Sequence, residues 1–301
     1  MKKRLSLCFC LLICLMVGVL SACSKDDQDS SPPPSAAPPP VTTPVATWPP
    51  VIDPSGNTLL TRFNPPEGYV RVPVAEGSFG AFLRDLPLKE DGAPVLLLDG
   101  TARADVPQAA VILLDISGTS KQSGPRSMVR LRAEYLYSSG QTNLIVYHFL
   151  SGFTFPFSQW CEGYRVKVDG KQVEWVKSGD PSNDYKALLG YLNTLFVYSN
   201  TRALQLELMS ANDAQLGDVF INSDSGAVMI ADMAQNPNTG DTLFMLARGS
   251  SPTQDIYILQ NVLDTSLSPW YSALYPLVTP EGEFTLEDLG RFNESPELDG
   301  E

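Results

Sequence analysis

The segment GDVFINSDSGAVMIA (residues 217–231) contains two apolar runs separated by a polar turn. Residues 218–221 and 227–231 are rich in Val, Ile, Phe and Ala, and the Asn-Ser-Asp-Ser sequence between them is typical of a turn. Two further apolar runs follow at residues 243–247 and 256–259, with a turn signal at residues 236–240 ahead of the first. The last third of the chain is therefore predicted to be a β meander.

The preceding residues alternate between helical and strand patterns. Gly124-Pro125 opens a predicted helix that continues to about Tyr137, since proline at the first turn costs no hydrogen bond. The other predicted helices are residues 78–86, 185–198 and 201–209, with Ser78 and Thr201 as N-caps. The other predicted strands are residues 69–74, 95–98, 111–116, 143–149 and 164–176, the last turned at Asp169-Gly170. These elements predict one α+β domain with an antiparallel sheet and packed helices.

The helix that begins at Pro125 has an amphipathic pattern. Met128, Leu131 and Tyr135, together with Leu136, lie along one side at helical spacing. The charged side chains are expected on the solvated side, and they are Arg126, Arg130, Arg132 and Glu134.

Composition limits the class of protein. The chain has 301 residues, of which 43% are hydrophobic, and this excludes a wholly disordered or fibrous protein. It has 21 Lys and Arg residues and 34 Asp and Glu residues, which gives a formal net charge of -13. Because binding to a phosphate backbone depends on neutralising cations, we expect no nucleic-acid partner.

The N-terminus has the features of a secretion signal. Lys2, Lys3 and Arg4 precede an apolar run at residues 5–20, and Leu-Ser-Ala-Cys follows at residues 20–23. This order resembles the lipobox of bacterial lipoproteins. The resemblance implies cleavage after residue 22 and acylation of Cys23, for example by palmitate. The alternative, an uncleaved membrane helix, is disfavoured because the apolar run is short and no basic stop-transfer cluster follows it.

A short acidic motif and a proline-rich segment follow Cys23. Lys25, Asp26 and Asp27 resemble the surface-export signal of Bacteroidota lipoproteins, which implies display on the cell surface of a Gram-negative bacterium, lipid-anchored in the outer membrane. The alternative is an ordinary acidic tether, with the protein in the periplasmic leaflet. Nine prolines between Ser30 and Pro50 predict an extended spacer.

These features divide the chain into four parts. Residues 1–22 are the predicted signal peptide, and residues 23–56 are the predicted lipidated N-terminus and disordered tether. Residues 57–293 form the predicted globular domain, and residues 294–301 form an acidic tail. Removing the basic signal makes the mature chain still more acidic, so the lipid, rather than attraction to anionic headgroups, must provide membrane binding.

Cysteine and histidine are scarce. Once the signal is removed and Cys23 is acylated, only Cys161 remains, so no disulfide can form within the mature chain. His148 is the only histidine, which excludes a zinc site with two histidine ligands. We expect structural roles for both Cys161 and His148, and we predict no metal and no cofactor. The alternative is a catalytic site in which Cys161 or Ser123 uses His148 as its base.

Several ordered runs resemble the lipoprotein family called domain of unknown function 4846. The similarity extends from about Asn57 to Phe292. The runs are Arg62-Phe63, Pro66–Arg71, Ser78–Arg84, Arg130–Leu136, Gly217–Ile221, Asp255-Ile256 and Ser268–Tyr271.

That family in turn resembles papain-like cysteine peptidases and amidases of the NlpC/P60 type, which cut cell-wall peptides. The resemblance implies a nucleophilic Cys at the start of a helix, a Gly-Asp pair before a later strand, a base His on the next strand and a third polar residue that orients the His. In this chain the Cys position holds Gly124, or Ser123 if the register shifts by one. The His position holds Gly226 and the orienting position holds Arg248, while Asp218 is retained.

The resemblance therefore implies a degenerate member that has lost catalysis. Its expected role is binding or envelope-associated assembly, with a peptidoglycan peptide, a glycan or another envelope protein as partner. One alternative is an active cell-wall peptide hydrolase with the relocated site described above. A second is a binding protein without enzymatic ancestry that uses the aromatic cluster Phe153, Phe155, Phe157 and Trp160.

Overall fold

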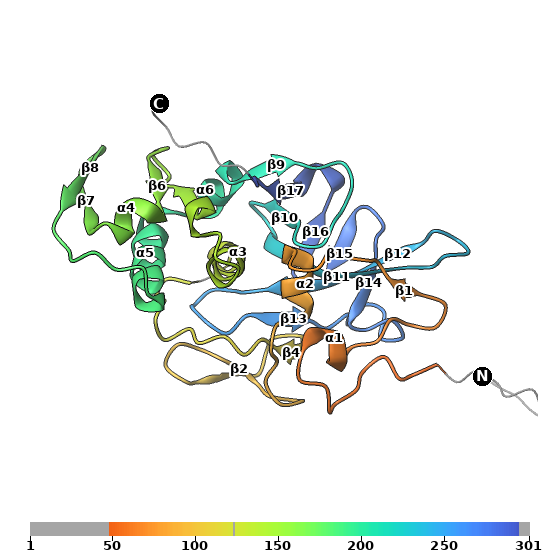
Figure 1. The fold of residues 1–301 in the computed structure, drawn as a ribbon. Helices are drawn as coiled ribbons and strands as arrows, with labels where there is room; N and C mark the ends of the chain where they lie inside the picture. Colours follow the sequence, from red (N-terminus) through yellow and green to blue (C-terminus); the bar gives the residue numbers. More distant parts are fainter. Residues whose placement is uncertain (1–47, 123, 295–301) are drawn as a thin grey trace, which may run out of the picture. The chain divides into compact units, whose positions relative to one another are not determined.

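The computed structural model of the chain describes residues 48–122 and 124–294 (Figure 1). Within these residues the fold is α+β and centres on a nine-stranded antiparallel sheet, which confirms the predicted fold class. Seven strands follow the order β4-β13-β12-β11-β10-β17-β9, while β1 pairs with β11 and β14 pairs with β12. The strands are β1 (Val70–Arg71), β4 (Gln108–Val111), β9 (Leu208–Ser210), β10 (Val219–Asn222), β11 (Gly226–Gln235), β12 (Thr242–Arg248), β13 (Tyr257–Leu259), β14 (Trp270–Ser272) and β17 (Leu289–Phe292).

Strand β11 is covered on both faces. Residues 227–234 are all buried. Met229 and Ala231 belong to one apolar core, which includes the helices, while Val228 and Ile230 belong to a second core on the opposite face. Because neither face meets water, the strand is apolar on both faces instead of alternating, except at the buried Asp232.

The helices pack on the first of these two faces. Met128 and Leu131 of α3, and Leu188 and Leu192 of α5, share the first core with Met229. The α-helices are α1 (Leu59–Arg62), α2 (Phe79–Arg84), α3 (Arg126–Ser138), α4 (Phe157–Cys161), α5 (Tyr185–Tyr198) and α6 (Thr201–Leu206), and the two 3-10 turns are η1 (Thr142–Leu144) and η2 (Leu286–Asp288).

Four hairpins lie outside the central sheet. They are β2 (Val95–Leu96) with β3 (Ala102–Arg103), β5 (Val146–His148) with β6 (Thr154–Pro156), β7 (Tyr164–Asp169) with β8 (Gln172–Lys177), and β15 (Leu277–Thr279) with β16 (Gly282–Phe284). Leu277 and Phe284 of the last hairpin pack in the second core. The central sheet is therefore covered by helices on one side and by this hairpin on the other.

Some element boundaries differ from the sequence predictions. The helix predicted over residues 201–209 ends at Leu206, and residues 208–210 form β9, which pairs with β17 at the sheet edge. The side chain of Asn200, rather than Thr201, caps this helix by accepting from Ala203 N at 3.1 Å. Pairing with a neighbouring strand thus outweighs local helix propensity.

The residues just before Asn57 are attached to the domain. Ile52 forms a bridge with Phe63, and Asn64 N donates to Val51 O at 2.7 Å. Part of the segment that the sequence assigns to the tether therefore pairs with the first helix region.

Helix α3 is buried on nearly all sides. The prediction that its charged side chains face solvent is therefore wrong. Arg130 has no exposed surface, Arg132 is 6% exposed and Glu134 is 9% exposed. Arg132 lies over the ring of Phe79 at 5.1 Å and that of Tyr135 at 5.3 Å, where cation–π attraction partly replaces hydration. Only Arg126 is partly exposed among the four charged residues.

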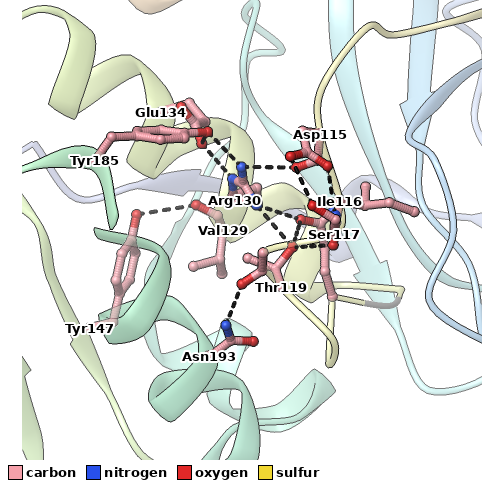
Figure 2. A network of polar contacts seen from close by, with 12 residues as sticks. Asp115, Ile116, Ser117, Thr119, Val129, Arg130, Glu134, Tyr147, Tyr185 and Asn193 are labelled. Carbon is pink, nitrogen blue, oxygen red and sulfur yellow. Dashed lines mark hydrogen bonds and ion pairs between the residues drawn. The ribbon is translucent and has the colours of Figure 1, made fainter. Parts of the chain in front are cut away.

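Arg130 is held by a complete set of acceptors (Figure 2). Its Nε donates to Glu134 Oε1 at 2.5 Å, and Tyr185 OH donates to the same oxygen at 2.9 Å. Its Nη1 donates to Thr119 Oγ1 at 2.9 Å, and its Nη2 reaches Asp115 O at 3.3 Å. One side chain therefore ties α3 and α5 to the loop that precedes α3.

We predict that Arg130→Met destabilises the domain by about 3 kcal/mol or more, because it leaves the buried Glu134 carboxylate without its cation. Chemical denaturation measures this loss. The matched control is Arg202→Met on α6, where the arginine is exposed and the expected change is within about 0.5 kcal/mol. Equal effects of the two substitutions would contradict the assigned role of Arg130.

Candidate functional site

Three sequence-predicted positions gather at one end of the central sheet. Strand β11 begins at Gly226 and its antiparallel partner β12 ends at Arg248, so these two residues lie at the same end. Helix α3 reaches this end through its N-terminus. A Cβ atom built on Gly249 would lie 1.9 Å from Ser127 Oγ and 3.7 Å from the carbonyl oxygen of Gly124.

The three positions lie on two faces of the sheet. Arg248 is opposite Tyr257 in the β12–β13 register, and Tyr257 belongs to the core that faces the β15–β16 hairpin. A Cβ atom built on Gly226 would lie 3.8 Å from Arg248 Nη2, so this position shares a face with Arg248. Gly249 and Gly124 meet on the α3 side. The nucleophile position and the base position of the amidase pattern thus point away from each other.

The backbone at both glycines adopts a conformation that favours glycine. Gly124 has φ +53° and Gly226 has φ +78°, in the left-handed region that other residues rarely adopt. A Cys at the first position or a His at the second would therefore be strained. The residue at the N-cap of α3 is Pro125, which provides no side-chain cap.

Arg248 is held by acceptors at the end of β11. Its Nη1 donates to Ser225 O at 3.0 Å, and its Nη2 lies 3.0 Å from Glu281 Oε2 in the turn between β15 and β16. The side chains of Arg248 and Glu281 are 11% and 27% exposed. A guanidinium has only donors, so Arg248 at the orienting position cannot accept a hydrogen bond from a base.

Asp218, the retained acid of the pattern, has a structural role. It is 1% exposed, and its carboxylate accepts from Arg291 Nε and Nη2, both at 2.8 Å. Gln215 N also donates to it at 2.8 Å. Burial raises the pKa of Asp218, and the hydrogen bonds from Arg291 and Gln215 oppose this rise. This ion pair joins β10 to β17, away from Gly226, which lies at the other end of β10.

His148 contacts a buried carboxylate. Its backbone N donates to Glu207 Oε1 at 2.6 Å, and its ring Nδ1 lies 3.3 Å from both carboxylate oxygens. Burial raises the pKa of Glu207, against the hydrogen bonds from His148. The adjoining cavity, which Arg126 and Tyr147 also line, measures about 10 Å³. That volume holds about one water, so this is not a cleft that admits a peptide.

Cys161 ends α4 in different surroundings. The thiol is free and half-buried, and burial raises its pKa, with Arg165 opposing this rise. The residues that line the cavity beside His148 do not include Cys161. A nucleophilic thiol needs a lowered pKa, so the environment of Cys161 is that of an inert side chain.

Other predicted positions lie outside the described residues. They are Cys23, Lys25, Asp26 and Asp27 of the predicted anchor and export signal, and Ser123 of the alternative catalytic site. In the part of the chain that the structure describes, no helix is long and apolar enough to cross a membrane, and no group of three or more His, Cys, Asp or Glu side chains could hold a metal.

The aromatic cluster of the binding alternative is part of the core. Phe155 and Phe157 have no exposed surface and Trp160 is 7% exposed. Phe155 stacks on Tyr191 of α5 with ring centres 4.6 Å apart. These rings stabilise the helical layer and do not form an exposed ligand platform.

Two larger grooves lie away from the end of the sheet at Gly226. Each has a volume of about 630 Å³. The first lies beside Tyr69, Met233 and Tyr275, near the opposite ends of β11 and β12, and the second beside Leu150 and Val197.

The sequence did not point to the polar residues that surround Arg248. Glu281 lies in a Pro-Glu-Gly turn at residues 280–282, Gln254 follows a loop, and Tyr257 is part of an apolar strand. Each residue has an ordinary local context. Only the pairing of β12 with β13 and the docking of the β15–β16 turn bring them together.

Comparison with protein families matches residues 59–291 to the family described as a domain of unknown function (4846). Comparisons with curated proteins and with solved structures found no match.

The raised pKa of Cys161 predicts the pH dependence of its reaction with iodoacetamide. Because burial disfavours the thiolate, we expect the alkylation rate to keep rising with pH beyond the ordinary pKa of a thiol. Mass spectrometry of the intact protein over a pH series measures this rate, with a small thiol such as glutathione as the reference. Rapid alkylation at or below neutral pH would instead identify an activated nucleophile.

Proposed function

The chain belongs to the domain of unknown function (4846) family, and we propose that it is a lipid-anchored, non-catalytic relative of NlpC/P60 amidases that binds an envelope component. The observation that supports this proposal is that α3, β11 and β12 share one sheet end, where the positions of the amidase pattern hold Gly124 on one face and Gly226 and Arg248 on the other. The order of helix, strand and strand along the chain agrees with the amidase pattern.

The chemistry at this site supports the loss of hydrolysis. Acyl transfer needs a nucleophile and a base within hydrogen-bond reach of each other. Two glycines in left-handed conformations and an arginine paired with Glu281 supply neither group. The loss of either member of such a pair removes several orders of magnitude in rate. What remains is a set of hydrogen-bond donors that can hold a ligand.

The proposed location is the outer membrane, with the domain displayed at the cell surface. Support comes from the lipobox-like order around Cys23, the acidic motif that follows it and the proline-rich spacer before the domain. Within the described residues no helix could span a membrane, so the proposed attachment relies on the lipid. The proposed partners are a cell-wall peptide, a glycan or another envelope protein.

We predict that the full-length protein releases no new amines from purified peptidoglycan or from its stem peptides. A reaction with an amine-specific reagent measures the release, and an active NlpC/P60 enzyme is the positive control. Release by the wild-type protein that is lost in Cys161→Ser or His148→Ala would contradict the proposal and establish the relocated site. The same two substitutions are expected to change nothing if the protein is non-catalytic.

We further predict that Cys23→Ser abolishes labelling by a palmitate analogue and releases the protein from the membrane fraction. Changing Lys25, Asp26 and Asp27 to Ala is expected to preserve labelling but to protect the protein from protease added to intact cells. The control is Cys14→Ser, because Cys14 leaves with the predicted signal. Unchanged protease sensitivity of the triple variant would place the export information elsewhere.

A further inference from the structure

Glu281 contacts only one of the two nitrogens on one edge of the Arg248 guanidinium. A guanidinium binds a carboxylate best through two parallel hydrogen bonds, as Arg291 binds Asp218 through Nε and Nη2, both at 2.8 Å. On the same edge of Arg248, Nη2 meets Glu281 at 3.0 Å, but the buried Nε has no partner. An unsatisfied buried donor on a charged group is costly, so an acceptor that pairs with both nitrogens of this edge would be favoured.

Two further buried donors also lack acceptors. The hydroxyl of Tyr257 interacts with the Arg248 guanidinium, but no acceptor takes its own proton, and the residue has no exposed surface. Burial raises the pKa of Tyr257 to about 12, partly offset by Arg248, so the hydroxyl keeps its proton at neutral pH. Gln254 is also fully buried. Its Oε1 accepts from Arg103 Nη1 at 3.0 Å, which leaves Nε2 as a donor without a partner.

Arg248 and Tyr257 lie together beside Gly226, and Arg103 links Gln254 to them. Arg248 and Tyr257 are directly opposite each other on neighbouring strands, where Cβ atoms lie about 5 Å apart. Arg103, which binds Gln254, also acts electrostatically on the phenol of Tyr257. The missing side chain at Gly226 adds space, because Arg248 Nη2 is the nearest heavy atom to a Cβ built there and is 3.8 Å away. Buried donors on a guanidinium and on the phenol opposite it, with too few acceptors, favour a ligand that brings oxygen atoms and negative charge.

The β15–β16 turn covers this cluster. Glu281 in the turn provides the acceptor now present, and its side chain is 27% exposed. The hairpin is fastened to the β10–β11 turn by Asn222 Nδ2 and Ser225 Oγ, which donate to Glu283 O at 3.0 and 3.2 Å. Glu281 thus stands between solvent and the Arg248 edge, where an incoming carboxylate must displace it.

We propose that Arg248, Tyr257 and Gln254 form a binding site for a ligand carboxylate, and that Glu281 occupies the site in the free protein. The free carboxylate of a peptide end fits this chemistry, because its two oxygens can accept from both nitrogens of the Arg248 edge and from the two neutral donors. The site deepens the proposed function, since it names the chemical class of ligand bound where the amidase base would lie. The charge on Glu281 opposes entry of a second carboxylate, so its removal strengthens binding.

The test is calorimetric titration of the full-length protein with N-acetyl-alanyl-alanine, its C-terminal amide and acetate. We expect the free acid to bind and the amide to bind at least about tenfold more weakly, since a hydrogen bond to a charged group is worth roughly that factor. Glu281→Gln should tighten binding of the free acid by about tenfold or more, and Tyr257→Phe should weaken it. The matched control is Glu283→Gln, which removes an exposed charge from the same hairpin.

Three results would overturn the proposal. They are equal binding of acid and amide, equal effects of Glu281→Gln and Glu283→Gln, or no binding of the free acid by both the wild type and Glu281→Gln. Binding of acetate as tight as that of the dipeptide would keep the carboxylate site but show that a small acid, not a peptide end, is its source. Hydrolysis of the dipeptide would contradict the non-catalytic function while leaving the carboxylate site intact, so the two proposals fail separately.

Discussion

The burial of β11 on both faces is the constraint on which the rest of the fold depends. A strand whose residues 227–234 are all inaccessible to water needs a cover on each side. The helices provide one cover and the β15–β16 hairpin provides the other. Charged groups that enter this interior must be paired, and Asp232 on β11 shows how. Its carboxylate has no exposed surface and accepts from Arg71 Nε and Arg84 Nε, both at 2.7 Å, which fixes β1 and α2 to the central strand.

The sequence was sufficient for much of this architecture. The apolar runs of the last third predicted β10 to β13 closely, and proline at Pro125 located the start of α3, because these signals are local. The burial of Arg130 and Glu134 could not be predicted. On a helix pattern alone, charged residues belong to the solvated side, and only the loop at residues 115–122 and Tyr185 provide their partners. The early end of α6 likewise depends on β17, which lies more than 80 residues later in the chain.

The candidate site could also be predicted only in part from the sequence. The resemblance to the amidase pattern predicted that Gly124, Gly226 and Arg248 belong to one site, and the fold places them at one end of the sheet but on two faces. The resemblance could not indicate that strand alternation directs Arg248 away from α3 and toward Glu281, because the face of a strand residue depends on the pairing register. Buried donors at this end outnumber their acceptors. This imbalance is the basis of the proposed carboxylate site.

Strand β17 lies between β10 and β9, although it is formed by residues 289–292 near the end of the chain. Asp218 on the β10 side obtains its cation only when Arg291 arrives. A chain that is still being synthesised therefore lacks the piece that joins the sheet edge to its centre. The edge strand β9 can be joined to the centre of the sheet only after residues 289–292 have been synthesised.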